Sequence, residues 1–92
     1  MARTAKRVWG FDEAERAVLW DATTELPALR AVLERGVAHA EIRGLLIVQA
    51  TVGELDAMYT LVEELTDGTR SRRRRELLDG LRASLCTAMD GF

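Results

Sequence analysis

The 92-residue sequence has little of what holds small secreted domains together, since Cys86 is its only cysteine and Pro27 its only proline. A single cysteine excludes an intramolecular disulfide, whereas secreted domains of this size usually contain several. We therefore expect a reducing compartment, most simply a bacterial-type cytoplasm. The most apolar run, residues 44–52, is far shorter than the roughly 20 residues of a membrane-spanning helix. We therefore expect a soluble protein with no membrane partner.

Residues that carry catalysis or bind metals are also scarce. His39 is the only histidine, and no second ligand lies at the i+3 or i+4 spacing of a helical metal site. The simplest interpretation is that His39 is exposed or caps the start of a helix. Cys86 has no zinc-site spacing, and we expect it to be a small buried residue. Glycine-rich phosphate loops are absent as well. The sequence thus predicts no enzyme, no cofactor and no metal.

Charge is unevenly distributed, although the formal net charge is only −2. The first eleven residues contain three basic groups and no acid. Residues 12–68 are strongly acidic, and the chain from residue 69 onward is basic again. Opposite charges on separate segments favour intramolecular docking or self-association.

The sequence predicts a basic tail over residues 1–10 and one helical domain over residues 11–92. Asp12 and Glu15 have the spacing of a capping box, which predicts a helix over about 12–23. Thr23 or Thr24 could cap a second helix, because Pro27 is tolerated in a first helical turn. This helix is expected to run to Arg35 and to end at Gly36.

Residues 37–65 have a helical pattern whose internal boundary stays open. One long helix fits the apolar spacing, but Thr51 with Glu54 forms a second capping-box pattern that would divide it. A strand over residues 45–52 is a third alternative, because Ile47, Val48 and Val52 are β-branched. The strand is disfavoured, since no second strand is evident to pair with it.

The C-terminal third predicts an antiparallel helical hairpin, about 52–66 and 71–89, joined by the turn at residues 67–69. Leucines and other apolar residues repeat at three-four spacing on both sides of this turn: Leu55, Met58, Val62 and Leu65, then Leu78, Leu81, Leu85 and Ala88. The predicted fold class is therefore all-α, with four to five helices. Two hairpins would complete a four-helix bundle by dimerisation.

Apolar residues outside these stripes supply the leading functional hypothesis. A monomer would leave several of them exposed as a patch; they are Leu46, Ile47, Val48, Leu61 and Leu77. We therefore expect a non-enzymatic protein-protein interaction or adaptor module that forms a homodimer.

An arginine run is the feature that fits a structural role least well. Arg70, Arg72, Arg73, Arg74 and Arg75 precede or begin the last helix, where the helix dipole disfavours cations. Our first interpretation is solvated charge paired with the acidic middle segment of the same chain or of a second subunit. The alternative function is a small nucleic-acid-associated regulator that uses this run and the N-terminal basic tail. Against it, the run is short, the chain is net acidic and no aromatic residue interleaves the arginines.

Three aromatic residues, Trp9, Phe11 and Trp20, lie near the N-terminus. Packing in the core or docking of the tail is the simplest interpretation. A contact with a partner through Trp9 and Trp20 is the alternative, because tryptophan is a frequent interface anchor.

Overall fold

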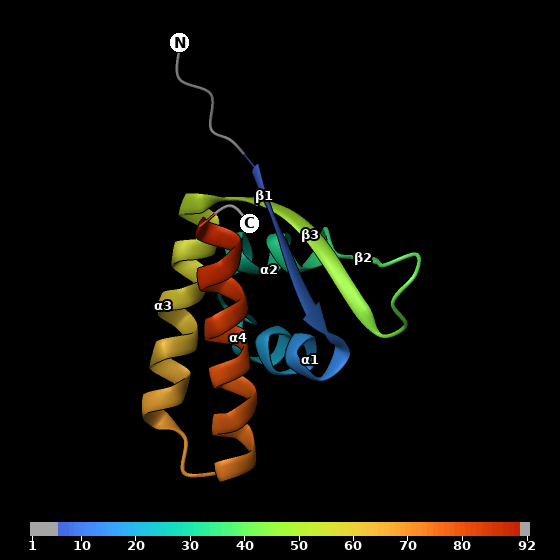
Figure 1. Ribbon diagram of the computed structural model, residues 1–92. Coiled ribbons are helices and arrows are strands. Elements are labelled where there is room, and N and C mark those ends of the chain that lie inside the picture. The colour runs from blue at the N-terminus through green and yellow to red at the C-terminus, as the bar shows by residue number, and fades with distance from the viewer. Residues whose placement is uncertain (1–5, 91–92) are drawn as a thin grey trace.

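The computed structural model describes residues 6–90, which form four helices and a three-stranded antiparallel sheet (Figure 1). The elements follow in the order β1 (Lys6–Asp12), α1 (Glu13–Ala22), α2 (Pro27–Glu34), β2 (Val37–Ala38), β3 (Leu45–Thr51), α3 (Val52–Gly68) and α4 (Arg72–Asp90). The all-α prediction is wrong, because the sheet makes this a small mixed α/β domain. Residues 1–5 of the expected basic tail lie outside the described residues, and residues 6–10 belong to β1.

The sheet has the strand order β1-β3-β2, so the N-terminal strand pairs with a strand some forty residues away. Trp9 pairs with Val48, and the register continues without interruption from Lys6 opposite Thr51 to Asp12 opposite Leu45. A strand over residues 45–52 was disfavoured because no second strand was evident in the sequence to pair with it. That reasoning was wrong because the segment expected to be a tail supplies the partner and satisfies the backbone of β3.

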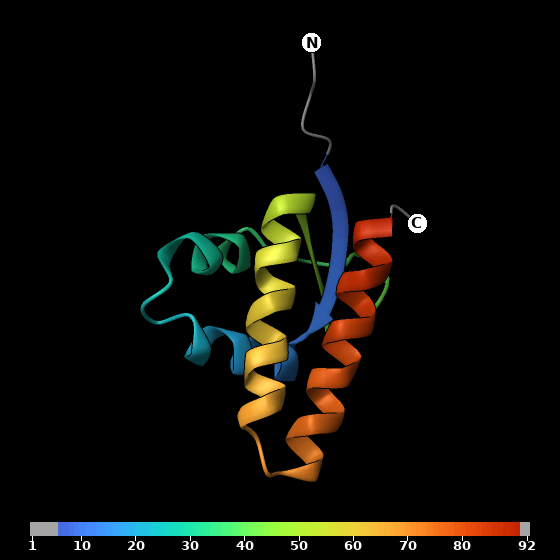
Figure 2. The same ribbon diagram turned by 90° about the vertical axis from the view of Figure 1, so that its left-hand side faces the viewer.

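The helical hairpin expected over 52–66 and 71–89 corresponds to α3 and α4, which lie side by side and antiparallel in both views (Figures 1 and 2). Both apolar stripes point into the protein, and Leu55, Met58, Leu81 and Leu85 are fully buried. The hairpin packs against the sheet, where Trp9 and Val48 join the same core. The prediction of a bundle completed by dimerisation is therefore wrong, since the sheet already covers the faces that a second hairpin would have covered.

Local caps set most of the helix boundaries. Asp12 caps α1 in a capping box with Glu15, as predicted. Helix α2 begins at Pro27 after Leu26, which makes no side-chain cap, so the expected threonine cap was wrong. Thr23 instead ends α1, where its buried hydroxyl donates to the carbonyl oxygen of Leu19 at 2.8 Å.

Candidate functional site

One face of the sheet has no helix against it. In Figure 1, α3 and α4 lie to the left of the sheet, α1 lies below it and α2 lies behind it. Side chains alternate between the two faces of a strand. Trp9, Phe11, Val48 and Ala50 are buried and point toward the helices. The opposite face, which we call the open sheet face, therefore carries the alternate residues: Lys6, Val8, Gly10 and Asp12 of β1, Val37 of β2, and Leu45, Ile47 and Gln49 of β3.

The centre of the open sheet face is apolar and exposed. Val8 is 56% exposed and Val37 is 59% exposed, and Ile42 in the β2–β3 loop is 54% exposed. Gly10 opposite Ile47 adds no side chain to this surface. A depression of about 330 Å³ opens beside β2; its lining consists of Lys6, Val8, Arg35, Val37, Ile47, Val48 and Gln49. Exposed large aliphatic side chains on the two outer strands of a sheet face are typical of a surface that another protein covers.

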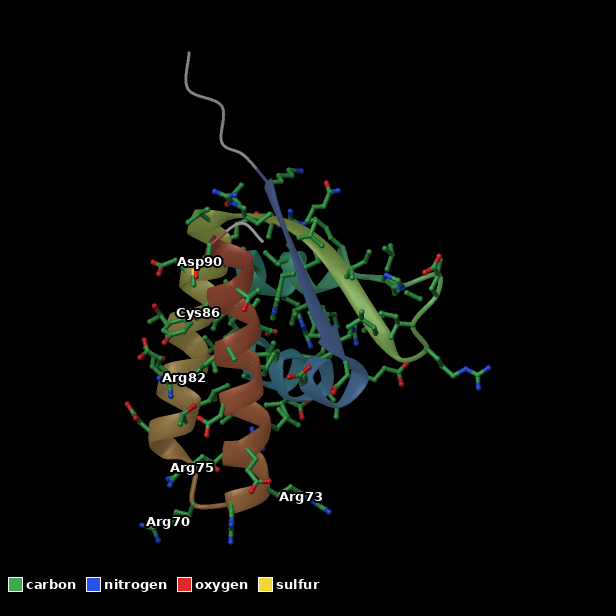
Figure 3. All side chains as sticks on the ribbon, in the orientation of Figure 1. Arg70, Arg73, Arg75, Arg82, Cys86 and Asp90 are labelled. Carbon is green, nitrogen blue, oxygen red and sulfur yellow. The ribbon has the colours of Figure 1, made fainter. Side chains whose placement is uncertain are left out.

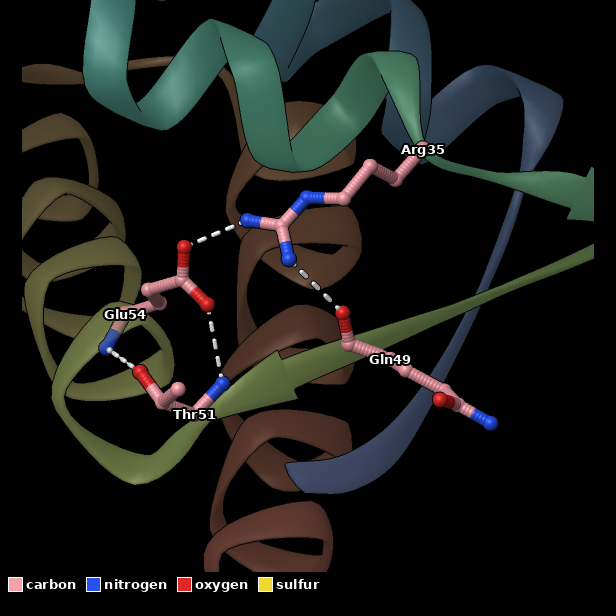
Figure 4. A network of polar contacts seen from close by, with 4 residues as sticks. All are labelled: Arg35, Gln49, Thr51 and Glu54. Carbon is pink, nitrogen blue, oxygen red and sulfur yellow. Dashed lines mark hydrogen bonds and ion pairs between the residues drawn. The ribbon is translucent and has the colours of Figure 1, made fainter. Parts of the chain in front are cut away.

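Arg35 closes the edge of β3 beyond the short strand β2 (Figure 4). Its Nη1 donates to the carbonyl oxygen of Gln49 at 3.0 Å, and its Nη2 forms an ion pair with the carboxylate of Glu54. That carboxylate also accepts from the backbone N–H of Thr51 at 2.9 Å, and the Thr51 hydroxyl accepts from the backbone N–H of Glu54. The capping box thus begins α3 where β3 ends, as the Thr51–Glu54 pattern predicted.

The ionisation of Glu54 is favoured by this network. The hydrogen bond from Arg35, with the hydrogen bond from the Thr51 backbone, lowers the pKa of the Glu54 carboxyl below its ordinary value. Arg35 thereby occupies a main-chain acceptor that an exposed strand edge would otherwise offer to another chain. Arg35 and the short strand β2 thus both lie along this edge of β3.

The two ends of the open sheet face differ in charge. Lys6 and Arg35 border one end, close to Gln49. Asp12 lies at the other end of β1, opposite Leu45. Lys6 and Asp12 are six positions apart on an extended strand, which is about 20 Å.

The arginine run lies at the far tip of the α3–α4 hairpin, away from the sheet (Figure 3). Ser71 caps α4 by accepting from the backbone N–H of Arg74 at 3.2 Å. Nη2 of Arg75 donates to the carbonyl oxygen of Thr69 at 3.1 Å. Arg70, Arg72, Arg73, Arg74 and Arg75 are all exposed.

Within residues 6–90, the arginine run forms one ion pair, between Arg72 and Glu76 at 3.5 Å. Both side chains are largely exposed, at 94% and 70%, so this pair contributes little. The acidic middle segment of the same chain therefore does not neutralise the arginines in the described structure.

The two tryptophans occupy different environments. Trp9 is 1% exposed and packs against Phe11 with tilted rings whose centroids are 4.5 Å apart. Its Nε1 donates to Oγ of Ser84 at 3.0 Å. Trp20 is half-buried, and two guanidinium groups lie near its ring, Arg30 at 3.7 Å and Arg16 at 4.7 Å from the ring centroid. Cation–π contacts from its own chain thus cover the Trp20 ring.

The remaining candidates form no reaction centre among residues 6–90. Nδ1 of His39 accepts from the backbone N–H groups of Glu41 and Ile42, each at 3.0 Å, so His39 caps a turn between strands rather than a helix. Cys86 is exposed, which contradicts the expected burial. No three His, Cys, Asp or Glu side chains of this part of the chain gather as a metal site would require. No helix there is long and apolar enough to cross a membrane.

Sequence reasoning did not find the open sheet face. The signal available was the alternation in residues 6–12, where Trp9 and Phe11 share one face and Val8 and Gly10 the other. The positive charges before Trp9 instead indicated a tail. Arg35 likewise resembled an ordinary residue at a helix end, because its two acceptors lie 14 and 19 positions away.

Comparison of the chain with models of known protein families gave no match, and neither a curated protein nor a solved structure matched it.

Proposed function

We propose that this protein is a non-enzymatic protein-protein interaction module that self-associates through the open sheet face. The observation that carries the proposal is the exposure of Val8 and Val37 on the uncovered side of the sheet. A cytoplasmic setting belongs to the same proposal, because the single thiol of Cys86 is compatible with a reducing compartment.

Of the five apolar residues that first suggested self-association, the fold leaves only one outside the core. Val48 and Leu61 are buried, while Leu46 and Leu77 pack against the core, so the fold itself uses four of the five. Ile47 is the exception, because it lies on the open sheet face between Gly10 and Val37. Covering this remaining apolar surface gives self-association its free energy.

Sedimentation equilibrium of the whole chain tests the proposal. We expect dimers at micromolar to high micromolar concentration, because a face of three short strands is small for a protein interface. Val8→Ser on the face should weaken the dimer, whereas Val52→Ser should not, although Val52 is also 40% exposed, at the start of α3. A wild-type chain that stays monomeric at high micromolar concentration, or equal effects of the two variants, would contradict the proposal.

A second candidate function rests on the arginines of the hairpin tip. They have a single, largely exposed ion pair within the described chain and lie at the positive end of the α4 dipole. This arrangement supports a nucleic-acid-associated regulator that contacts backbone phosphates without reading sequence. Titration of duplex DNA or RNA at rising salt tests it: affinity should fall steeply with salt, and Arg73→Gln with Arg74→Gln should reduce both affinity and the salt slope. No binding at low salt would exclude this function.

A further inference from the structure

We infer that the occupant of the open sheet face is a second copy of this chain, stacked face to face about a two-fold axis that lies perpendicular to the strands. The inference rests on the proposed function, because it adds the arrangement of the two copies to the surface already proposed. It is carried by the placement of charge, of Gly10 and of the depression beside Arg35 on the same face.

Charge at the two ends of the face selects the axis. An axis perpendicular to the strands stacks β1 on β1 of the partner in the opposite direction. Lys6 then faces Asp12 of the partner subunit, and the same pair forms a second time by symmetry. An axis parallel to the strands would instead place the end with Lys6 against the same end of the partner, so that neither Lys6 nor Asp12 faces an opposite charge. Arg35 does not take part in this choice, because it is already paired with Glu54.

The steric pattern fits the same axis. With the axis at the level of Trp9 and Val48, residue 8 of one copy lies over residue 10 of the other. Val8 therefore lies over the partner's Gly10, which has no side chain of its own, and meets the apolar side chains beside it. Leu45 and Ile47 flank that position, since a methyl group built on Gly10 would lie 3.3 Å from Leu45 Cδ1 and 3.9 Å from Ile47 Cγ2.

The depression beside β2 has a matching occupant. Val37 pairs with Ile47, and Arg35 binds the main chain at Gln49, two residues further along β3. Rotation about the two-fold axis places the level of Ile47 in one copy over the level of Gln49 in the other. It also keeps each strand over the same strand of the partner. The exposed Val37 of each copy thus lies over the depression that Arg35 lines in the other.

A double-mutant cycle on dimer affinity tests the arrangement, using sedimentation equilibrium at about 0.1 M salt, where charges about 20 Å apart within one chain are screened. Lys6→Glu should weaken the dimer roughly tenfold, because it places two carboxylates together twice. Asp12→Ser preserves the helix cap of α1. It should weaken the wild-type dimer but strengthen the Lys6→Glu dimer, and this reversal of sign is the expected result. Glu13→Ser, at the next position, is the matched control and should show no coupling to residue 6.

Val37→Ser separates face-to-face stacking from pairing of two β1 edges, which would also bring Lys6 near the partner's Asp12. Stacking predicts a loss of at least tenfold in dimer affinity, while edge pairing leaves Val37 exposed and affinity unchanged. An unchanged affinity, or a dimer in which Asp12→Ser has the same effect in both backgrounds, overturns this arrangement and leaves self-association standing. A monomeric wild-type chain removes the proposed function itself.

Discussion

The indole N–H of Trp9 in β1 donates to Oγ of Ser84 in α4 at 3.0 Å, which joins residues 75 positions apart in the sequence. The Ser84 hydroxyl in turn donates to the carbonyl oxygen of Leu81 at 2.9 Å. The N-terminal strand is thus joined to the C-terminal helix by a part-buried hydrogen bond in addition to their apolar contacts.

Replacing Ser84 with alanine should therefore reduce the free energy of unfolding by about 1–2 kcal/mol, because the buried indole N–H loses its acceptor. Urea unfolding measures this loss. Thr87→Ala on the exposed side of the same helix is the matched control and should change stability little. Equal effects of the two substitutions would show that the Trp9–Ser84 bond contributes nothing to stability.

Replacing Arg35 with glutamine should make the unfolding free energy less dependent on acid pH. Arg35 lowers the pKa of Glu54 in the folded protein, so the stabilisation by the ionised Glu54 is complete above the unfolded pKa of about 4.3. The contribution is lost as the pH falls through the lower, folded pKa. Wild type should therefore exceed Arg35→Gln by about 1 kcal/mol at neutral pH, with the difference shrinking in acid, because both side chains are about one-third exposed.

The matched control for this measurement is Arg43→Gln, since Arg43 lies in the exposed β2–β3 loop. Unfolding should be followed at a concentration where the chain is monomeric, so that association does not contribute. A constant difference between wild type and Arg35→Gln from neutral to acid pH would contradict the assigned ion pair.

Replacing Leu85 with aspartate should abolish folding, as should the same change at Leu81. Both leucines are fully buried in the core beneath the sheet, and an unpaired buried carboxylate costs several kcal/mol in a domain with little stability to spare. Cys86→Asp is a close control, because the adjacent side chain is exposed. Circular dichroism should show an unfolded Leu85 variant and a folded Cys86 variant, and a folded Leu85→Asp protein would refute the register of α4.

Changing both Arg73 and Arg74 to glutamate should leave the unfolding free energy equal or raise it by roughly 0.3–1 kcal/mol per residue, because acids favour a helix N-terminus. Thermal unfolding measures the effect. Dimer affinity should not change, since the arginines lie far from the open sheet face (Figure 3). A loss of dimer affinity that shrinks at high salt would instead show that the run pairs with the acidic segment of a second subunit.

The sequence by itself determined the elements whose signals are local. The two capping boxes, at Asp12 and at Thr51, depend on contacts three residues apart, and the stripes of α3 and α4 depend on spacing within one helix. Periods and caps of this kind can be read from a single segment. The connection of the hairpin was predicted at residues 67–69 and lies at residues 69–71, because α3 continues to Gly68.

Tertiary structure decided the sheet, and with it the candidate site. A strand gains its hydrogen bonds only from a partner strand. For β3 that partner is β1, some forty residues earlier in the chain. Once β1 and β3 pair, alternation sends Trp9 and Val48 into the core and leaves Val8 and Ile47 on the open side. Tertiary structure also decided that Cys86 is exposed and that Arg30 packs over the Trp20 ring. The burial of a side chain depends on which elements pack against it.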